Sequence, residues 1–251
     1  VYGTCIGKDT FGREALEMYQ TEKINAEHVR YSTTGKSTGV GLIYVNAEGE
    51  NEIIIDFAAN NEFSREDVDQ MMPAIRECKL LLMQLECSMA TVEYAAQRCR
   101  EEGITFVLNP APYSPMKDEL LANCTYLTPN ESEARQILGL VADDPIADEE
   151  VAERIFQKGV KNVIMTRGKK GAYVRSEQMA ETIEGFAVEA VDTTGAGDTF
   201  TGAFCVALAE GKSILDAIRF GNAAAGISVT RYGVVESIPT RDEIEKRLEV
   251  K

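Results

Sequence analysis

One short stretch of the chain places a glycine-rich turn directly before a carboxylate. Asp198 follows the small residues Gly195, Ala196 and Gly197, and apolar residues then recur at helical spacing until Gly211. A glycine-rich turn at a helix start presents unpaired N–H groups and the positive end of the helix dipole, which together favour a phosphate. A carboxylate is repelled by a phosphate, but it can accept a proton from an incoming hydroxyl. Asp198 is therefore a candidate general base, and a helix-capping role for it stays equally open.

Two better-known phosphate motifs do not fit the sequence. Residues 35–38 read GKST, like the end of a Walker A loop, but the glycine required five residues before Gly35 is replaced by Arg30. A dinucleotide fingerprint that began at Gly195 would need a small residue at position 200, where Phe200 stands. The predicted phosphate site is therefore of a different kind.

The composition narrows the class of protein. The chain has 251 residues, which fits one large α/β domain or slightly more, and its net charge of −15 argues against nucleic acid or an anionic membrane as a partner. No apolar run reaches the ~18 residues of a membrane span. The six cysteines form no CxxC pair, which favours reduced core thiols in a cytoplasmic protein. The only histidine, His28, is expected in a polar connection, so zinc and Ser–His chemistry lack partners.

Strand-like and helix-like patterns alternate along the chain. We expect strands over 2–6, 40–45, 52–55, 80–85, 104–108, 126–128, 163–166 and 171–175. We expect helices over 11–22, 64–77, 88–102, 130–139, 148–159, 198–210 and 213–229, a short one at 120–121, and a last one from residue 240. Residues 46–49 are expected to turn a hairpin between 40–45 and 52–55. The alternation predicts a parallel sheet with helices on both faces.

Polar side chains stand where these elements begin or end. Glu86 ends an apolar strand, and ligands of open α/β sheets lie beyond the carboxyl ends of the strands. Asn130 and Glu133 are three residues apart at a helix start, so both can face one ligand, although an ordinary helix cap gives the same spacing. Ser64 with Asp67, and Ser88, are expected to cap the helices that follow them.

Residues 192–204, DTTGAGDTFTGAF, resemble the C-terminal signature of the ribokinase-like (PfkB) carbohydrate kinases. Other segments resemble the same family in the same order: STGVGLIYVNAEGEN, LLMQLE, LNPAP, LTPNESEA, AIRFGNAAAGISVTRYG and ESIP. The resemblance covers essentially the whole chain. It implies an α/β fold, a three-layer αβα sandwich with a mostly parallel sheet, over residues 1–251 and a small β lid whose hairpin lies at about 39–56.

The resemblance also implies that the family's first α/β section is absent. In the family, a first strand with a substrate-binding Asp, part of the lid and a GGKGAN sugar-binding segment precede the segment that resembles VYGTCIGKDTFG. At ~30 residues per βαβ unit, on the order of 60 residues are expected to be missing, so the lid is expected to be partly missing as well. A non-catalytic remnant that binds nucleotide but no sugar is therefore an alternative to an active kinase.

The function implied by the resemblance is ATP-dependent phosphorylation of a sugar, first of all at the 5-hydroxyl of D-ribose. Kinases for fructose, ketodeoxygluconate or a nucleoside share the same centre and stay open as alternatives. Asp198 is then the base, and the sugar also contacts Asn60 and Glu86. The stabilising amides are those of Gly195, Ala196 and Gly197. The implied partners are a small-molecule sugar and ATP, and the lid implies a homodimer when the N-terminus is complete.

Nucleotide and ion sites follow from the same resemblance. The implied cofactors are ATP, Mg²⁺ and K⁺, with magnesium near Asn130 and Glu133. The nucleotide-binding residues are Asn130, Thr166, Gly168, Gly171 and Asn222, the last at a position that is commonly His in the family. Oxygen ligands suit the activating potassium ion. Its implied site comprises Asp192, Thr194, Ser228, Arg231, Gly233 and Ser237.

Overall fold

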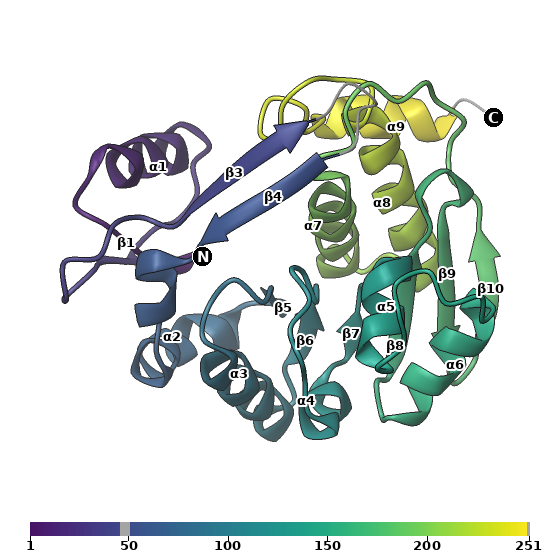
Figure 1. Cartoon of the computed structure of the whole chain (residues 1–251), viewed down its shortest axis with the longest axis horizontal. Coiled ribbons are helices and arrows are strands. Elements are labelled where there is room, and N and C mark those ends of the chain that lie inside the picture. The colour runs from purple at the N-terminus through teal and green to yellow at the C-terminus, as the bar shows by residue number, and fades with distance from the viewer. Residues whose placement is uncertain (46–50, 250–251) are drawn as a thin grey trace. The chain divides into compact units, whose positions relative to one another are not determined.

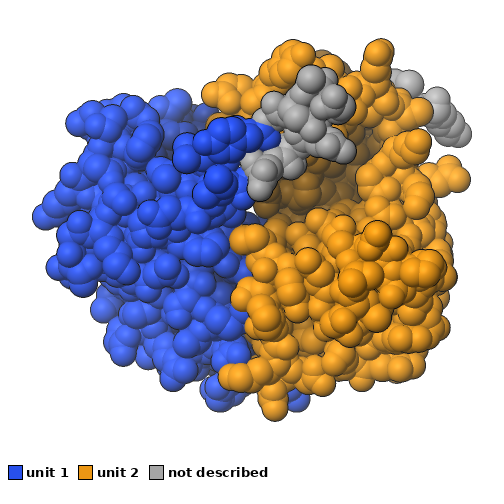
Figure 2. All heavy atoms as spheres, in the orientation of Figure 1, with its two compact units in different colours: residues 1–104 blue, residues 105–251 orange. Residues whose placement is uncertain are grey.

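The computed structural model describes residues 1–45 and 51–249, so the predicted turn at 46–49 lies outside the described residues. The chain divides into two compact units, residues 1–104 and 105–251 (Figure 2). The prediction of one kinase domain over residues 1–251 stays a prediction. Within the described ranges, no helix combines the length and the apolar character needed to cross a membrane.

The first unit contains two small sheets and three α-helices. Strands β1 (Gly3–Ile6) and β2 (His28–Tyr31) pair in parallel around α1 (Thr10–Thr21), whereas β3 (Val40–Val45) and β4 (Asn51–Asp56) form the antiparallel hairpin predicted for the lid. The 3₁₀ turn η1 (Ala58–Glu62), α2 (Arg65–Glu77), β5 (Leu80–Met83) and α3 (Met89–Glu102) follow. The prediction of a polar connection at His28 was wrong, because this residue opens β2. The four residues of HVRY are too short a run for alternation to identify a strand.

Two of the predicted helix caps in this unit have different outcomes. Ser64 and Asp67 form the predicted capping box of α2, with both reciprocal bonds present. Ser88 occupies the N-cap position of α3, but its side chain makes no cap hydrogen bond. The sequence pattern therefore predicted both helix starts correctly, but the side-chain cap expected from Ser88 does not form.

The second unit is built on a mostly parallel sheet flanked by helices (Figure 1). Within this unit the strand order is β10 (Ala180–Ile183), β9 (Ala172–Ser176), β8 (Asn162–Thr166), β7 (Tyr126–Leu127) and β6 (Thr105–Leu108). Strands β6, β7 and β8 pair in parallel, and β9 runs antiparallel to both β8 and β10, so β9 alone among these strands is reversed. Its helices are α4 (Asp118–Asn123), α5 (Glu131–Ile137), α6 (Asp148–Gln157), α7 (Ala196–Ala209), α8 (Ile214–Ser228) and α9 (Arg241–Glu249), and η2 (Gly168–Lys170) joins β8 to β9. This arrangement confirms the predicted α/β class.

The position of α7 is fixed by aromatic packing on the sheet and on α8. Phe204 is fully buried, and its ring meets the edge of Tyr126 from β7 at a centroid distance of 5.4 Å. Phe200 stacks beside Phe204 at 6.1 Å. On the other side, a Cβ added to Gly221 of α8 would lie 2.8 Å from the Phe200 ring. Because both helices approach so closely there, the start of α7 has little freedom to move.

The six cysteines are free, as predicted for reduced thiols. Four of them are buried: Cys5, Cys99, Cys124 and Cys205. Cys78 and Cys87 are partly exposed. Burial raises the pKa of the Cys87 thiol to about 11, and the nearby charge of Glu86 adds to that effect.

Candidate active site

The glycine-rich turn lies at the N-terminus of α7, where the sequence predicted an anion site. Gly195 is the N-cap residue with a φ of 72°, a left-handed conformation that glycine adopts without steric cost. The N–H of Ala196 donates to the carbonyl of Thr193 at 3.2 Å. Within the described part of the chain, the N–H groups of Gly195 and Gly197 have no protein acceptor. These two donors are therefore available to an anion.

Asp198 is the third residue of α7 and lies beside the end of β6. Its Oδ1 accepts a hydrogen bond of 3.1 Å from Nδ2 of Asn109, the buried residue that directly follows β6. Asp198 is open to solvent on one side, but the protein around its other sides desolvates the carboxyl and raises its pKa; the bond from Asn109 opposes that rise. A carboxylate with a raised pKa accepts a proton more readily, as a general base requires.

Asn130 and Glu133 form a capping box at the start of α5. Oδ1 of Asn130 accepts from the N–H of Glu133, and Oε2 of Glu133 accepts from the N–H of Asn130, both at 2.8 Å. Desolvation raises the pKa of Glu133 to about 7; the Asn130 bond opposes that rise and the charge of Asp198 adds to it. The other carboxylate oxygen, Oε1, has no hydrogen-bond partner among the described residues. The helix-capping interpretation of this pair is thus confirmed, and one oxygen stays available to a ligand.

The carboxyl ends of three neighbouring strands meet at this point of the second unit. Asn130 follows β7 and forms a parallel β-bridge with Thr166, the last residue of β8. Asn109 follows β6 and reaches Asp198. Polar side chains therefore gather at the edge of the sheet where ligands of α/β folds bind.

The other predicted nucleotide residues surround the chain that follows β10. Gly171 has a φ of 87°, and a Cβ there would lie 2.2 Å from the carbonyl oxygen of Ile183. Nδ2 of Asn222 donates to the carbonyls of Ile183 and Glu184 at 3.1 and 3.2 Å. Gly168 also has a positive φ, of 51°. Asn222 thus holds residues 183–184 in place through its side chain, and the missing side chain of Gly171 lets residues 183–185 approach its backbone closely.

The predicted cation residues are only partly brought together. The Asp192 carboxylate accepts hydrogen bonds from the N–H of Thr194 at 2.9 Å and from the N–H of Gly233 at 3.3 Å. The backbone N–H of Asp192 donates to the carbonyl of Val229, the residue after Ser228. The Arg231 guanidinium instead pairs with Glu243, and the buried Ser237 hydroxyl donates to the carbonyl of Val234. Asp192 therefore joins two loops of this unit, and Arg231 and Ser237 have side-chain contacts elsewhere.

The predicted sugar-contacting residues Asn60 and Glu86 belong to the first unit. Asn60 lies on η1 and Glu86 follows β5, and both line one pocket of this unit together with Thr4 and Gln84. The structure therefore brings these two residues to a common cavity, within a unit separate from that of Asp198.

Comparison with known proteins identifies the family of this chain. The family model described as pfkB family carbohydrate kinase matches residues 1–241. The chain belongs to this family. It is accordingly a phosphotransferase whose acceptor is a sugar hydroxyl.

Individual members of the pfkB family resemble the chain over almost its whole length. A ribokinase from Haemophilus influenzae is 41% identical, with 98% of this chain and 80% of the relative covered. A solved ribokinase from Thermotoga maritima has a TM-score of 0.88 at 37% identity, over 98% of this chain and 80% of that one. A ribokinase from Arabidopsis thaliana, solved with ribose and ATP, has a TM-score of 0.88 at 28% identity and covers 99% and 81%.

Asn109, which bonds Asp198, had no role in the sequence-based prediction of the site. It lies in the LNPAP segment, which carried part of the resemblance. The available signal was a polar residue directly after an apolar strand and before a proline, the same signal that singled out Glu86. What the sequence could not give was the pairing of Asn109 with a residue 89 positions away.

Proposed function

We propose that the chain transfers the γ-phosphoryl group of ATP to the 5-hydroxyl of D-ribose. The observation that carries this proposal is the juxtaposition on α7 of two unpaired N–H donors, at Gly195 and Gly197, with the Asp198 carboxyl. The relatives support the substrate, because ribokinases are similar to the chain over its length and one of them was solved with ribose and ATP.

In this mechanism the protein positions the reactants and stabilises charge. Asp198 accepts the proton of the 5-hydroxyl as that oxygen attacks the γ-phosphorus, and the bond to the bridging oxygen of ADP breaks. The unpaired N–H groups of Gly195 and Gly197 would stabilise the charge that spreads over the phosphoryl oxygens, whereas the N–H of Ala196, predicted to join them, donates to the carbonyl of Thr193. The raised pKa of Asp198 supports its role as base, and Asn109 orients the carboxyl through its hydrogen bond.

The donor groups near Glu133 fit magnesium bound mainly by phosphates and water. Among the described residues, no group of three or more His, Cys, Asp or Glu side chains could hold a metal. Magnesium keeps several waters and typically uses one or two carboxylates together with substrate phosphates. Oε1 of Glu133 would be the protein carboxylate, directly or through water, and Asn130 would orient it. When bound, magnesium would neutralise charge on the phosphates of ATP.

We further propose that the loops joined by Asp192 hold an activating potassium ion. The carboxylate of Asp192 and backbone carbonyls of the loops at Ser228, Arg231 and Gly233 would supply oxygen donors, which suit a hard cation. The hydrogen bonds from the N–H groups of Thr194 and Gly233 hold the Asp192 carboxylate between these loops. Because these loops lead directly into Gly195, activity should be higher in potassium than in sodium salts of equal ionic strength. Equal rates in the two salts would contradict this site.

Asn60 and Glu86 are proposed to bind the sugar, and Thr166, Gly168, Gly171 and Asn222 to line the nucleotide site. The pocket shared by Asn60 and Glu86 supports the first assignment. The β-bridge that places Thr166 beside Asn130, and the positive φ angles of Gly168 and Gly171, support the second. The free thiols support a cytoplasmic location.

A substrate panel tests the proposed function. The full-length protein is incubated with ATP and magnesium and with ribose, 2-deoxyribose, fructose, ketodeoxygluconate or a nucleoside, and ADP release is measured. Ribose should give the highest kcat/KM, and its product should be ribose 5-phosphate by NMR. A higher kcat/KM for another acceptor would reassign the substrate, and ATP binding without any transfer would favour a non-catalytic nucleotide-binding protein.

A further inference from the structure

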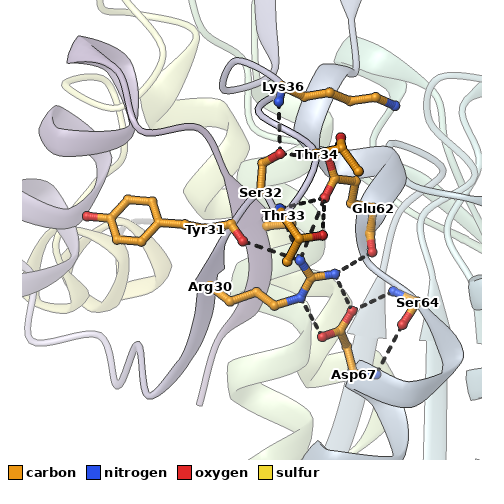
Figure 3. Close-up of polar contacts among 10 residues, drawn as sticks. Arg30, Tyr31, Ser32, Thr33, Thr34, Lys36, Glu62, Ser64 and Asp67 are labelled. Carbon is orange, nitrogen blue, oxygen red and sulfur yellow. Dashed lines mark hydrogen bonds and ion pairs between the residues drawn. The ribbon is translucent and has the colours of Figure 1, made fainter.

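The carboxylate of Glu62 ties together two segments of the first unit that lie on either side of the lid hairpin. Glu62 ends η1, which follows β4, and its partners lie in the segment between β2 and β3. Oε1 accepts from the hydroxyls of Ser32 at 2.7 Å and Thr34 at 2.5 Å, and Oε2 accepts from the N–H of Thr33 at 2.9 Å (Figure 3). We call Glu62 with Ser32, Thr33 and Thr34 the Glu62 clasp.

A second set of bonds fixes the main chain of Glu62. The guanidinium of Arg30, from β2, pairs with both carboxylate oxygens of Asp67 at 2.6 and 2.8 Å and also donates to the carbonyl of Glu62 (Figure 3). Asp67 in turn accepts from the N–H of Ser64 in the capping box of α2. The end of η1 is therefore held by its side chain, by its carbonyl and by the helix that follows.

The clasp acts on the turn that carries Asn60. The N–H of Ala59 donates to the carbonyl of Ser37 at 3.0 Å, so η1 lies along the same segment that the clasp grips. A Cβ at Gly39 would lie 3.0 Å from Oδ1 of Asn60, which shows how closely the two chains approach. The position of the Asn60 side chain thus depends on how η1 is held against residues 32–39.

The backbone of this turn is strained and needs such support. Ala58, the first residue of η1, has a φ of 37°, which is unfavourable for a residue with a Cβ. Strained backbone persists where the surrounding structure over-determines it, and it concentrates at ligand-binding sites. The neighbouring bonds that restrain Ala58 are its own N–H to Asp56 at 3.0 Å and the clasp at the other end of the turn.

We propose that Glu62 is a positioning residue that holds Asn60 in the orientation that binds the sugar. This inference rests on the proposed function, in which Asn60 contacts the sugar hydroxyls. Hydrogen bonds from Thr34 and Ser32 lower the pKa of Glu62 to about 2, so the carboxylate stays charged over the whole pH range of a kinase assay. Its charge strengthens the bonds that hold the segment between β2 and β3.

Glu62→Gln tests the proposal with little change in side-chain size. The amide nitrogen of Gln cannot accept a hydrogen bond, so part of the clasp is lost. In the full-length protein, the KM for ribose should rise by about fivefold to tenfold, the range that lost hydrogen bonds of roughly 1 kcal/mol predict, with the KM for ATP unchanged within a factor of two. The matched control is Glu77→Gln, which removes an exposed carboxylate at the end of α2. An unchanged KM for ribose in Glu62→Gln would overturn the proposal.

A double-mutant cycle separates positioning of Asn60 from general loosening of the unit. Asn60→Ala should raise the KM for ribose, and adding Glu62→Gln to it should have little further effect, because the second residue acts through the first. Independent, multiplicative effects on the KM, or no effect of Asn60→Ala, would contradict the proposal.

Amide hydrogen exchange supplies a readout that does not depend on which sugar is used. Exchange over residues 57–63 should be faster in Glu62→Gln than in wild type or Glu77→Gln, and exchange over α3 should be unchanged. Unchanged exchange at 57–63 would overturn the clasp whatever the substrate. If the exchange result holds and the panel selects another sugar, only the identity of the sugar fails, and the kinetic cycle is repeated with that sugar.

Discussion

At the scale of single residues, two carboxyl groups of the second unit have raised pKa values for the same main reason. Asp198 and Glu133 are both desolvated by the protein around them, and each also accepts hydrogen bonds that oppose the rise. Perturbed carboxyl groups gathered at the carboxyl ends of parallel strands are typical of catalytic sites. Their chemical roles differ, because Asp198 lies beside unpaired N–H groups and Glu133 caps a helix.

Asp198→Asn should lower kcat by two or more orders of magnitude, about the span of general-base effects. The amide keeps the size of the side chain and one oxygen that can accept the hydrogen bond from Asn109, so the melting temperature and the affinity for ATP should change little. Steady-state kinetics and calorimetry of ATP binding measure these effects. Asp143→Asn, at an exposed loop position, is the matched control. Retention of more than about a tenth of the wild-type kcat would exclude Asp198 as the base.

Glu133→Gln should increase stability at pH 8 relative to wild type, and should do so less at pH 5. The pKa of Glu133 is raised from the ordinary value of 4.5 to about 7, so the folded state holds a proton that the unfolded state has released. The wild-type side chain therefore loses stability as the pH rises from about 4.5 to 7, and Gln does not. Thermal unfolding at several pH values measures the difference. Glu177→Gln, at an exposed position, should show no such trend, and a pH-independent difference for Glu133→Gln would contradict the raised pKa.

At the scale of elements, the contact between α7 and α8 determines where the glycine-rich turn at Gly195 lies. The two helices approach at Gly221, where Phe200 from the first turns of α7 packs against bare backbone. Tyr126 of β7 contacts α7 from the side of the sheet. The helix that follows Gly195 is thus held from two directions, by Tyr126 on the side of the sheet and by Gly221 on the side of α8.

Gly221→Ala should destabilise the protein by about 1–3 kcal/mol, the usual penalty for overpacking a well-filled core. The added Cβ would lie 2.8 Å from the Phe200 ring, so one of the two helices has to shift. Gly226→Ala in the same helix is the control, because its Cβ would lie at an ordinary contact distance of 3.6 Å from Phe186. That change should be neutral or slightly stabilising, since alanine favours helices. Denaturant unfolding of both variants measures the contrast, and equal losses would contradict the packing account.

At the scale of the whole molecule, the β3–β4 hairpin exposes an apolar surface, and we propose that a second copy of the chain covers it. Leu42, Tyr44 and Ile54 are more than half exposed. Large exposed apolar patches mark interaction sites, and the family resemblance predicts a homodimer through the lid when the N-terminus is complete. Two copies that each carry a net charge of −15 repel each other, so burial of this apolar surface has to offset the repulsion before the copies can associate.

Ile54→Glu should therefore shift the full-length protein from dimer to monomer. A buried, unpaired carboxylate at the interface would be strongly unfavourable. Sedimentation velocity at several protein concentrations measures the distribution. Val141→Glu, at a position 65% exposed in the second unit, should leave that distribution unchanged. A wild-type protein that is monomeric at all concentrations would contradict the predicted dimer.

Most of the fold could be predicted from local pattern, and the site only in part. Apolar runs such as 104–108 and turn glycines such as Gly103 identify elements because each depends on neighbours in the sequence. Strands β2 and β10 were missed, because four half-polar residues carry too little pattern. Asn109 was missed because its partner Asp198 is brought to it by the fold alone. Likewise, no local pattern distinguishes the carboxylate of Glu62 from that of any other polar turn.

The location of Cys87 allows filling of the pocket in the first unit to be measured by chemical labelling. This thiol lines the pocket that Asn60 and Glu86 share, and it is partly exposed, whereas Cys5, Cys99, Cys124 and Cys205 are buried. A small alkylating reagent should therefore reach Cys87 and Cys78 before the buried thiols, and Cys87 should react slowly at neutral pH because its raised pKa of about 11 leaves little thiolate. With Cys78 as the internal reference, the relative labelling of Cys87 by mass spectrometry would follow how much of the pocket is filled, without any turnover and at any temperature at which the protein stays folded.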